Sequence, residues 1–221
     1  MKKALITLFL VLIIDQVLKI WIKLNFQYED SMLLINNLIE FKFIENPGMA
    51  FGLDFGGPYG KLVLSVIRLI AVFVIGRYLI KLVRTGAHGG FIICVSMILA
   101  GAIGNILDSA FYGLIFDQGL LWDDTIGDWN KMPYIRGGLA EMEEGYAPFL
   151  MGHVVDMFHF LPKFPDNAPW GLAGRDIFAP VFNVADAAIS IGVIVIILFQ
   201  KRFFPKSKDT PDLEENESVP A

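Results

Sequence analysis

The chain has 221 residues, of which 55% are hydrophobic and only 19% charged, and its formal net charge is −5. Because about a quarter of the residues in soluble domains are usually charged, this composition excludes an ordinary soluble domain and favours an integral membrane protein. The lack of a basic stripe excludes a nucleic-acid partner, and the single cysteine, Cys94, excludes an internal disulfide.

Four apolar runs predict transmembrane helices, because each approaches the roughly 20 residues that a helix needs to cross a bilayer. They cover about residues 4–24, 62–82, 89–107 and 184–199. The first run follows Lys2 and Lys3, as in a secretory signal peptide, but it has no small-x-small cleavage site. We therefore expect it to remain in the mature protein as a span.

Basic residues predict which side of the membrane each connection faces. Lysines and arginines precede the first run, flank the short turn between the second and third runs, and follow the fourth. We therefore expect both termini and this turn in the cytoplasm, and the loops 25–61 and 109–182 outside. Residues 1–204 then form a single membrane domain, and the polar residues 205–221 a disordered cytoplasmic tail.

The outer loops carry signals of their own. In the segment IEFKFIEN, Ile39, Phe41 and Phe43 would share one face of a strand, which predicts a small extracytoplasmic β-sheet lying on the membrane. The long outer loop contains tryptophans of the kind found at the headgroup level. The predicted fold class is therefore an integral membrane, mainly α protein with four transmembrane helices, a small outer sheet and a long outer loop.

Polar side chains within the spans gather at one predicted depth, near the outer surface. They are Asp15, Lys19, Asn105, Asp108, Asn183 and Asp186. On each helix these side chains share one face, and ionisable groups inside a membrane are costly, so their gathering indicates a functional site. A purely structural role, in which they hold the helices together, remains open. Arg68 and Arg77 of the second run are expected to reach the interfaces by snorkelling.

Five short patches then identify a family. They are DQVLK (Asp15–Lys19), ENPGMAFG (Glu45–Gly52), GAIGNILD (Gly101–Asp108), HVVDMF (His153–Phe158) and FNVADAAIS (Phe182–Ser190). In this order, and on these spans and loops, they resemble the signal peptidase II family, the lipoprotein signal peptidases of bacteria, over nearly the whole chain. The family usually has arginine after the aspartate of GNxxD, where this chain has Ser109, and the segment 109–155 is long for the family.

The resemblance implies a membrane aspartyl endopeptidase that removes signal peptides from diacylglyceryl-modified prolipoproteins, cutting before the lipidated cysteine. It implies Asp156 and Asp186 as catalytic residues, with no metal and no cofactor. Positions that match the family around the site are Asp15, Lys19, Asn46, Gly48, Ala50, Phe51, Asn105, Asp108, Asn183 and Ala185. The implied location is the bacterial cytoplasmic (inner) membrane, with the site at the outer leaflet. Globomycin is the expected inhibitor, prolipoproteins and membrane lipids are the expected partners, and we expect a monomer.

Two neighbouring carboxyl groups suit this chemistry. Because two like charges a few ångströms apart cannot both ionise, the pair shares one proton, so one group acts as base and the other as acid. Asp186 lies on a predicted helix and Asp156 in sequence expected to form a loop, so the fold can bring them together.

Two other readings stay open from the residues alone. His153, Asp156 and His159 form H-x-x-D-x-x-H, which would suit a metallopeptidase, although neither helix nor strand spacing aims all three side chains at one ion. A small proton or ion transporter would also carry charged residues within its spans. Transporters, however, tend to show repeated halves, and this chain has no evident internal repeat.

Overall fold

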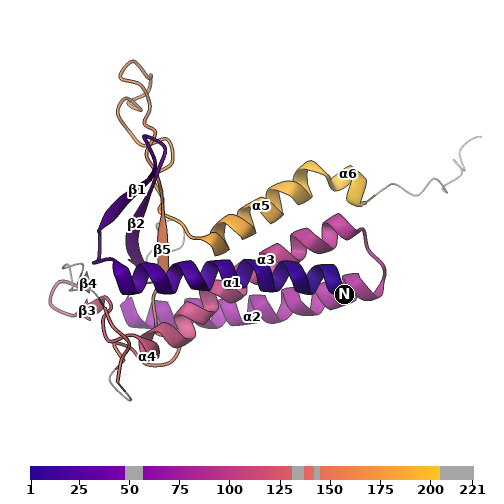
Figure 1. Ribbon diagram of the computed structural model, residues 1–221, viewed down its shortest axis with the longest axis horizontal. Helices are drawn as coiled ribbons and strands as arrows, with labels where there is room; N and C mark the ends of the chain where they lie inside the picture. Colours follow the sequence, from indigo (N-terminus) through magenta and orange to yellow (C-terminus); the bar gives the residue numbers. More distant parts are fainter. Residues whose placement is uncertain (48–56, 131–136, 142–144, 205–221) are drawn as a thin grey trace, which may run out of the picture.

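The structure is a computed structural model that describes residues 1–47, 57–130, 137–141 and 145–204. Long helices lie side by side as a bundle, and a small sheet stands across one end of it (Figure 1). The bundle helices are α1 (Lys2–Asn25), α2 (Gly57–Arg84), α3 (Gly89–Leu107) and α5 (Val184–Leu198). Helix α3 continues through the π-helix η1 (Asp108–Tyr112) and the short α4 (Gly113–Ile115), and α6 (Gln200–Phe203) follows α5.

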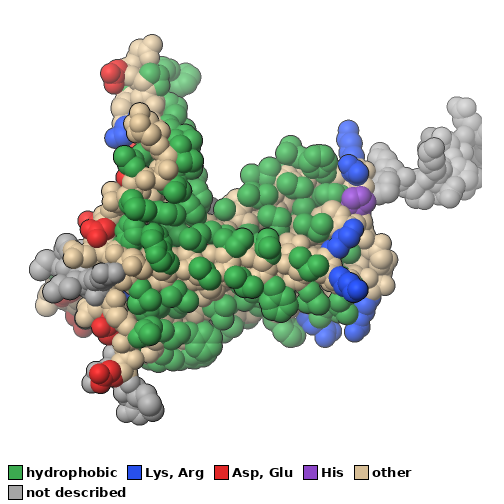
Figure 2. Space-filling model, in the orientation of Figure 1, with side chains coloured by type: hydrophobic (Ala, Val, Ile, Leu, Met, Phe, Trp, Pro, Cys, Tyr) green, Lys and Arg blue, Asp and Glu red, His purple; other side chains and the backbone are tan. Residues whose placement is uncertain are grey.

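Among the described residues, three helices are long and apolar enough to cross a membrane: Lys2–Asn25, Gly57–Arg84 and the continuous Gly89–Ile115. They confirm the first three predicted spans by length and composition. The fourth predicted span is an apolar helix of only 15 residues, about 22 Å long at 1.5 Å per residue. Basic side chains gather at one end of the bundle and acidic ones at the other, with hydrophobic side chains between (Figure 2).

Small residues let the bundle helices approach closely. A Cβ atom added at Gly101 of α3 would overlap the carbonyl oxygen of Ala185 in α5, and one at Gly104 would lie 2.6 Å from Oδ2 of Asp15 in α1. Ala185 itself is fully buried. The glycines of α3 therefore bring three polar helix ends to one place.

The sheet is antiparallel, in the order β1 (Ser31–Ile35), β2 (Ile39–Asn46) and β5 (Val154–Phe160). In β2 the buried positions alternate and include Phe41 and Phe43, as the sequence pattern predicts. These two rings pack with Ile22 of α1 and with Val155 and Met157 of β5 in one core cluster. This cluster fixes the sheet against the C-terminal part of α1.

One expectation about these loops is wrong. Asp156 lies on a strand rather than in a loop: it belongs to β5 and pairs with Ile44 of β2, because the Val154–Phe160 segment completes the sheet. The tryptophans of the long loop differ in exposure. Trp129, on the hairpin of β3 (Leu121–Asp123) and β4 (Asp128–Asn130), is buried, whereas Trp170 is 91% exposed.

Candidate active site

Asp156 and Asp186 come from different elements and are linked by one amide side chain. Asn183 is the N-cap of α5: its Oδ1 accepts a hydrogen bond from the N–H of Asp186 at 2.9 Å. The Asp186 carboxylate in turn accepts from the N–H of Asn183 at 3.4 Å. The Nδ2 group of Asn183 donates to Oδ1 of Asp156 at 2.7 Å. One residue thus orients both carboxyl groups that the sequence predicts as catalytic.

A second amide, Asn105 of α3, connects this pair to the rest of the bundle. Its Nδ2 group donates to Oδ1 of Asp186 at 2.8 Å. Its Oδ1 accepts from Nδ2 of Asn183 at 3.2 Å and from Nζ of Lys19 at 2.9 Å. Because Asn105 is buried and uses both ends of its amide, the orientation of Asp186 depends on three helices at once.

The two carboxyl groups differ in environment. Asp156 is buried, whereas Asp186 is half-buried. Burial raises the pKa of Asp156 well above its usual range, and the nearby charge of Asp186 raises it further; Lys19 and the hydrogen bond from Asn183 oppose this only in part. A raised pKa favours the protonated form of Asp156 beside the charge of Asp186, so the pair can hold one proton, as acid–base catalysis requires.

Lys19 forms a fully buried triad with two further carboxylates. Its Nζ lies 3.0 Å from Oδ2 of Asp15 and 2.7 Å from Oδ2 of Asp108. Asp15 also accepts from the N–H of Ala185 in the first turn of α5 at 2.9 Å, and Asp108 accepts from the N–H of Val155 in β5 at 3.3 Å. The triad therefore braces α1, α3, α5 and β5 around the carboxyl pair, which favours the structural reading of Asp15 and Lys19.

The structure describes only some of the remaining predicted positions. Asn46 is the last residue of β2, opposite Val154 in β5, and so lies beside the strand that carries Asp156. Ala185 packs at the close approach of α3 and α5. Gly48, Ala50 and Phe51 lie outside the described residues.

A second buried charge cluster was missed in the sequence. Glu45 pairs with Lys23, accepts from the N–H of Leu120 at 2.9 Å, and lies 3.3 Å from Nδ1 of His153. Burial opposes ionisation of Glu45, but Lys23 and His153 outweigh it and lower its pKa to about 2. Burial lowers the pKa of His153, although the hydrogen bond and the charge of Glu45 raise it. The signal was available: Lys23 follows Lys19 by one helical turn, and Glu45 begins the ENPGMAFG patch.

The two histidines of H-x-x-D-x-x-H point to different partners. His153 contacts Glu45, and Nδ1 of His159 lies 2.9 Å from Oε1 of Glu40. Asp156 alternates with them along the strand and faces the other side of the sheet. Within the described part of the chain, no three side chains of His, Cys, Asp or Glu come together as a metal site. The arrangement therefore gives no support to the metallopeptidase reading.

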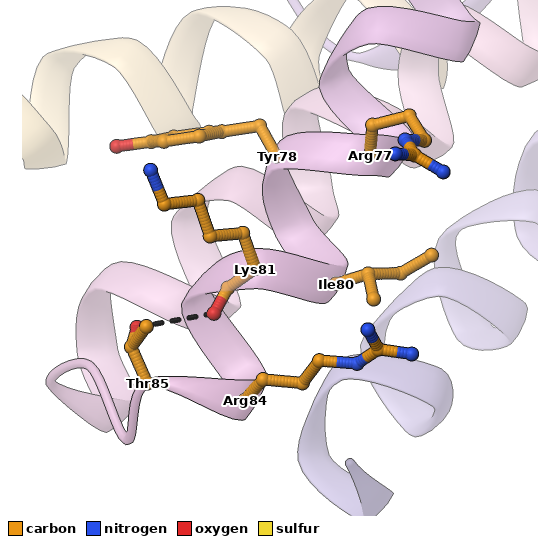
Figure 3. Close-up of a pocket in the computed structure, with 6 residues that line it drawn as sticks. All are labelled: Arg77, Tyr78, Ile80, Lys81, Arg84 and Thr85. Atoms are coloured by element: carbon orange, nitrogen blue, oxygen red, sulfur yellow. Dashed lines mark hydrogen bonds between the residues drawn. The ribbon is translucent and has the colours of Figure 1, made fainter.

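A surface hollow of about 610 Å³ lies near the C-terminal end of α2 (Figure 3). It is lined by Arg77, Tyr78, Ile80, Lys81, Arg84 and Thr85. Three of these side chains are basic and none is a carboxylate, so this hollow offers neither the acid nor the base that the carboxyl pair provides.

Comparisons with known proteins show which proteins the chain is similar to. Residues 7–202 match the family model described as signal peptidase (SPase) II. The chain is 40% identical over 200 residues to a lipoprotein signal peptidase of Porphyromonas gingivalis strain ATCC 33277, covering 87% of this chain and 80% of that relative. It is 36% identical over 195 residues to one from Amoebophilus asiaticus strain 5a2, covering 86% of this chain and 73% of that relative.

A solved structure supports the fold alone. The structure is of a bacterial membrane enzyme, determined by the in meso method, and it matches with a TM-score of 0.55 at 22% sequence identity. The match covers 96% of this chain and 95% of the other. With the family model spanning nearly the whole sequence and two relatives above 30% identity, the chain belongs to the signal peptidase II family.

Proposed function

We propose that the chain is an aspartyl endopeptidase that removes signal peptides from diacylglyceryl-modified prolipoproteins, cutting before the lipidated cysteine. Membership of the signal peptidase II family supports the reaction. The observation that carries the mechanism is the hydrogen-bonded link from Asp156 through Asn183 to Asp186. Asp156 and Asp186 are the proposed catalytic residues, and no cofactor is required.

The proposed reaction uses one water molecule and one shared proton. The ionised carboxylate takes a proton from the water as its oxygen attacks the scissile carbonyl carbon, and the neutral carboxyl donates its proton to the carbonyl oxygen. The tetrahedral intermediate then collapses: the C–N bond breaks, the leaving amine takes a proton from the pair, and one hydroxyl of the intermediate returns its proton to the pair as the new C=O bond forms. The products are a signal peptide with a free carboxylate and a lipoprotein with a free cysteine amine. The proton belongs to the pair rather than to either residue.

The proposed membrane placement has four spans within one domain, residues 1–204, with both termini in the cytoplasm and residues 205–221 as a tail. The basic end of the bundle supports this orientation (Figure 2). The short α5 supports a site slightly below the outer surface: a helix of about 22 Å that begins at the carboxyl pair needs less than the full 30 Å or so of hydrocarbon to reach the inner side. Lys201 and Arg202 of α6 would then lie at the inner interface.

This depth suits the proposed substrate. Acyl chains hold a diacylglyceryl cysteine at the leaflet surface, while the signal helix continues into the bilayer. A carboxyl pair at the same level reaches the scissile bond without drawing either part out of the lipid. The sheet β1-β2-β5 would lie outside the membrane, and we propose that the enzyme works as a monomer in the bacterial inner membrane.

The test is cleavage of a lipidated prolipoprotein by the purified wild type, Asp156→Asn and Asp186→Asn, with and without globomycin. General acid–base groups typically contribute about 10²- to 10⁴-fold, so each variant should lose at least that much kcat while keeping its melting temperature. Near-normal kcat in either variant would refute the two-carboxylate mechanism. No cleavage by the wild type would refute the function itself.

A further inference from the structure

One face of α2 carries a polar stripe that points toward the site. Lys61, Ser65 and Arg68 are spaced i, i+4 and i+7, so they lie above one another on the helix. Nζ of Lys61 donates to Oγ of Ser109 at 3.2 Å, and Oγ of Ser65 donates to the carbonyl of Leu150 at 2.9 Å. Both partners belong to the segments that flank the carboxyl pair, η1 and the loop before β5.

The same stripe continues into the contact between α2 and α3. Val72, Ile75 and Leu79 follow Arg68 on this face and pack in the core cluster that includes Val95 and Leu99 of α3. Arg68 therefore lies between a polar contact with η1 and an apolar contact with α3.

The guanidinium of Arg68 is incompletely satisfied. Its Nη1 atom is buried and has no hydrogen-bond partner among the described residues, and Arg68 forms no ion pair with them. The group still lies within electrostatic range of Asp186, Asp156 and Asp108. An unpaired buried donor costs about 1–3 kcal/mol, and more when it is charged, so this nitrogen favours an acceptor beyond those that the described residues supply.

We propose that Arg68 is a substrate-binding residue whose Nη1 donates a hydrogen bond to a carbonyl oxygen of the prolipoprotein held at the carboxyl pair. This inference rests on the proposed function. At this depth the substrate offers uncharged carbonyl oxygens from two sources, the main chain around the scissile bond and the esters of the diacylglyceryl group. A carbonyl fits better than a second anion, since a further negative charge would lie beside Asp186 and Asp156.

The experiment measures kcat and KM of the full-length enzyme on a lipidated prolipoprotein peptide, for the wild type, Arg68→Gln, Arg68→Lys and the control Arg77→Gln. Arg77 is an arginine further along the same helix, where it lines the hollow near the C-terminal end of α2 (Figure 3). We expect Arg68→Gln to raise KM about tenfold or more, as for loss of a hydrogen bond from a charged group, with a smaller change in kcat. Arg68→Lys should recover part of the loss, and Arg77→Gln should match the wild type.

A second substrate, with ether in place of ester linkages, identifies the acceptor. If an ester carbonyl is bound, the ether substrate raises KM for the wild type and Arg68→Gln causes no further rise. If a main-chain carbonyl is bound, Arg68→Gln raises KM equally on both substrates. Melting temperatures of all variants are measured in the same detergent.

The proposal is overturned if Arg68→Gln keeps the wild-type KM on the ester substrate. It is also overturned if Arg77→Gln raises KM as much as Arg68→Gln does, because the rise would then not depend on the unpaired nitrogen of Arg68. A wild type that cleaves normally in either case leaves the proposed function intact. A wild type that does not cleave refutes both.

Discussion

At the scale of single residues, the site depends on side chains that use every hydrogen-bonding group they have. Asn183 caps α5 with its carbonyl oxygen and orients Asp156 with its amide nitrogen, while Asn105 joins Asp186 to Lys19. An amide can do this because it carries both donor and acceptor, whereas a carboxylate or a lysine carries only one kind. The carboxyl pair is therefore held by neutral groups, and the charged triad lies one layer behind it.

The buried triad gives the first prediction at this scale. Lys19→Met should destabilise the protein by about 3–5 kcal/mol, because it leaves Asp15 and Asp108 buried without a cation. The measurement is chemical unfolding of purified protein in detergent micelles. Lys163→Met is the control, since the Lys163 side chain is 63% exposed and its pair with Asp176 should contribute about 1 kcal/mol or less. Equal stability of Lys19→Met and wild type would contradict the bracing role.

At the scale of elements, the sequence predicted the helices better than the strand that carries Asp156. Long apolar runs mark a span whatever surrounds them, and three of the four predicted spans recur as helices of sufficient length. The strand β5 depends on pairing with β2, which lies more than a hundred residues earlier, so its local sequence says little. The Glu45–Lys23 pair was missed for the same reason, because it joins β2 to α1 across the fold.

The same contrast applies to the residues of the candidate site: those in sequence motifs could be predicted, and one that is placed by helix packing could not. Residues within recognisable patches, such as Asp186 and Asn105, could be chosen from sequence, and the structure brings them together. Arg68 could not, because it stands in an apolar run with no motif around it. Its importance appears only when α2 packs against α3 and leaves one nitrogen without a partner among the described residues.

The close approach of α3 and α5 gives the prediction at this scale. Gly101→Ala places a methyl group against the Ala185 carbonyl oxygen, so it should cost about 1–3 kcal/mol and lower kcat by shifting Asp186. Gly76→Ala is the control, since the nearest atom to its added methyl is 4.0 Å away, at Leu99. Unfolding in detergent and cleavage assays measure the two effects. If Gly101→Ala behaved like Gly76→Ala, the tight helix contact would not position the site.

At the scale of the whole molecule, the bundle, the sheet and the long segment after α4 are joined by the Glu45 cluster. Lys23 comes from α1, Glu45 from β2, and His153 from the residue before β5, while Leu120 belongs to the long segment after α4. Lys23 also donates to the carbonyl of Gln118 at 2.6 Å. Backbone groups of the segment after α4 are therefore held by the charged Lys23 and Glu45 side chains, so these contacts depend on pH through the ionisation of Glu45.

The pH dependence follows from the direction of both shifts. Glu45 has its pKa lowered from 4.5 to about 2, so the stability that it contributes is complete above about pH 4.5 and is lost as the pH falls toward 2. The pKa of His153 is lowered from 6.5. Below pH 6.5, His153 therefore binds a proton more readily in the unfolded chain than in the folded protein, and the stability of the fold falls there as well. As the pH falls, the contacts of the segment after α4 should therefore weaken in two stages, first as His153 is protonated and then as Glu45 is protonated.

We expect Glu45→Gln to melt well below the wild type at pH 7, because it leaves Lys23 buried without its anion, and the difference should shrink as the pH approaches 2. Thermal unfolding in detergent from pH 3 to pH 8 measures this difference. Limited proteolysis of the segment after α4 shows at which pH that segment becomes accessible. Glu29→Gln is the control, since Glu29 is exposed and should leave the curve unchanged. A wild-type melting temperature that stays constant from pH 7 to pH 3 would contradict the ionic anchor, because both proton-linked contacts must weaken across that range if they hold the segment in place.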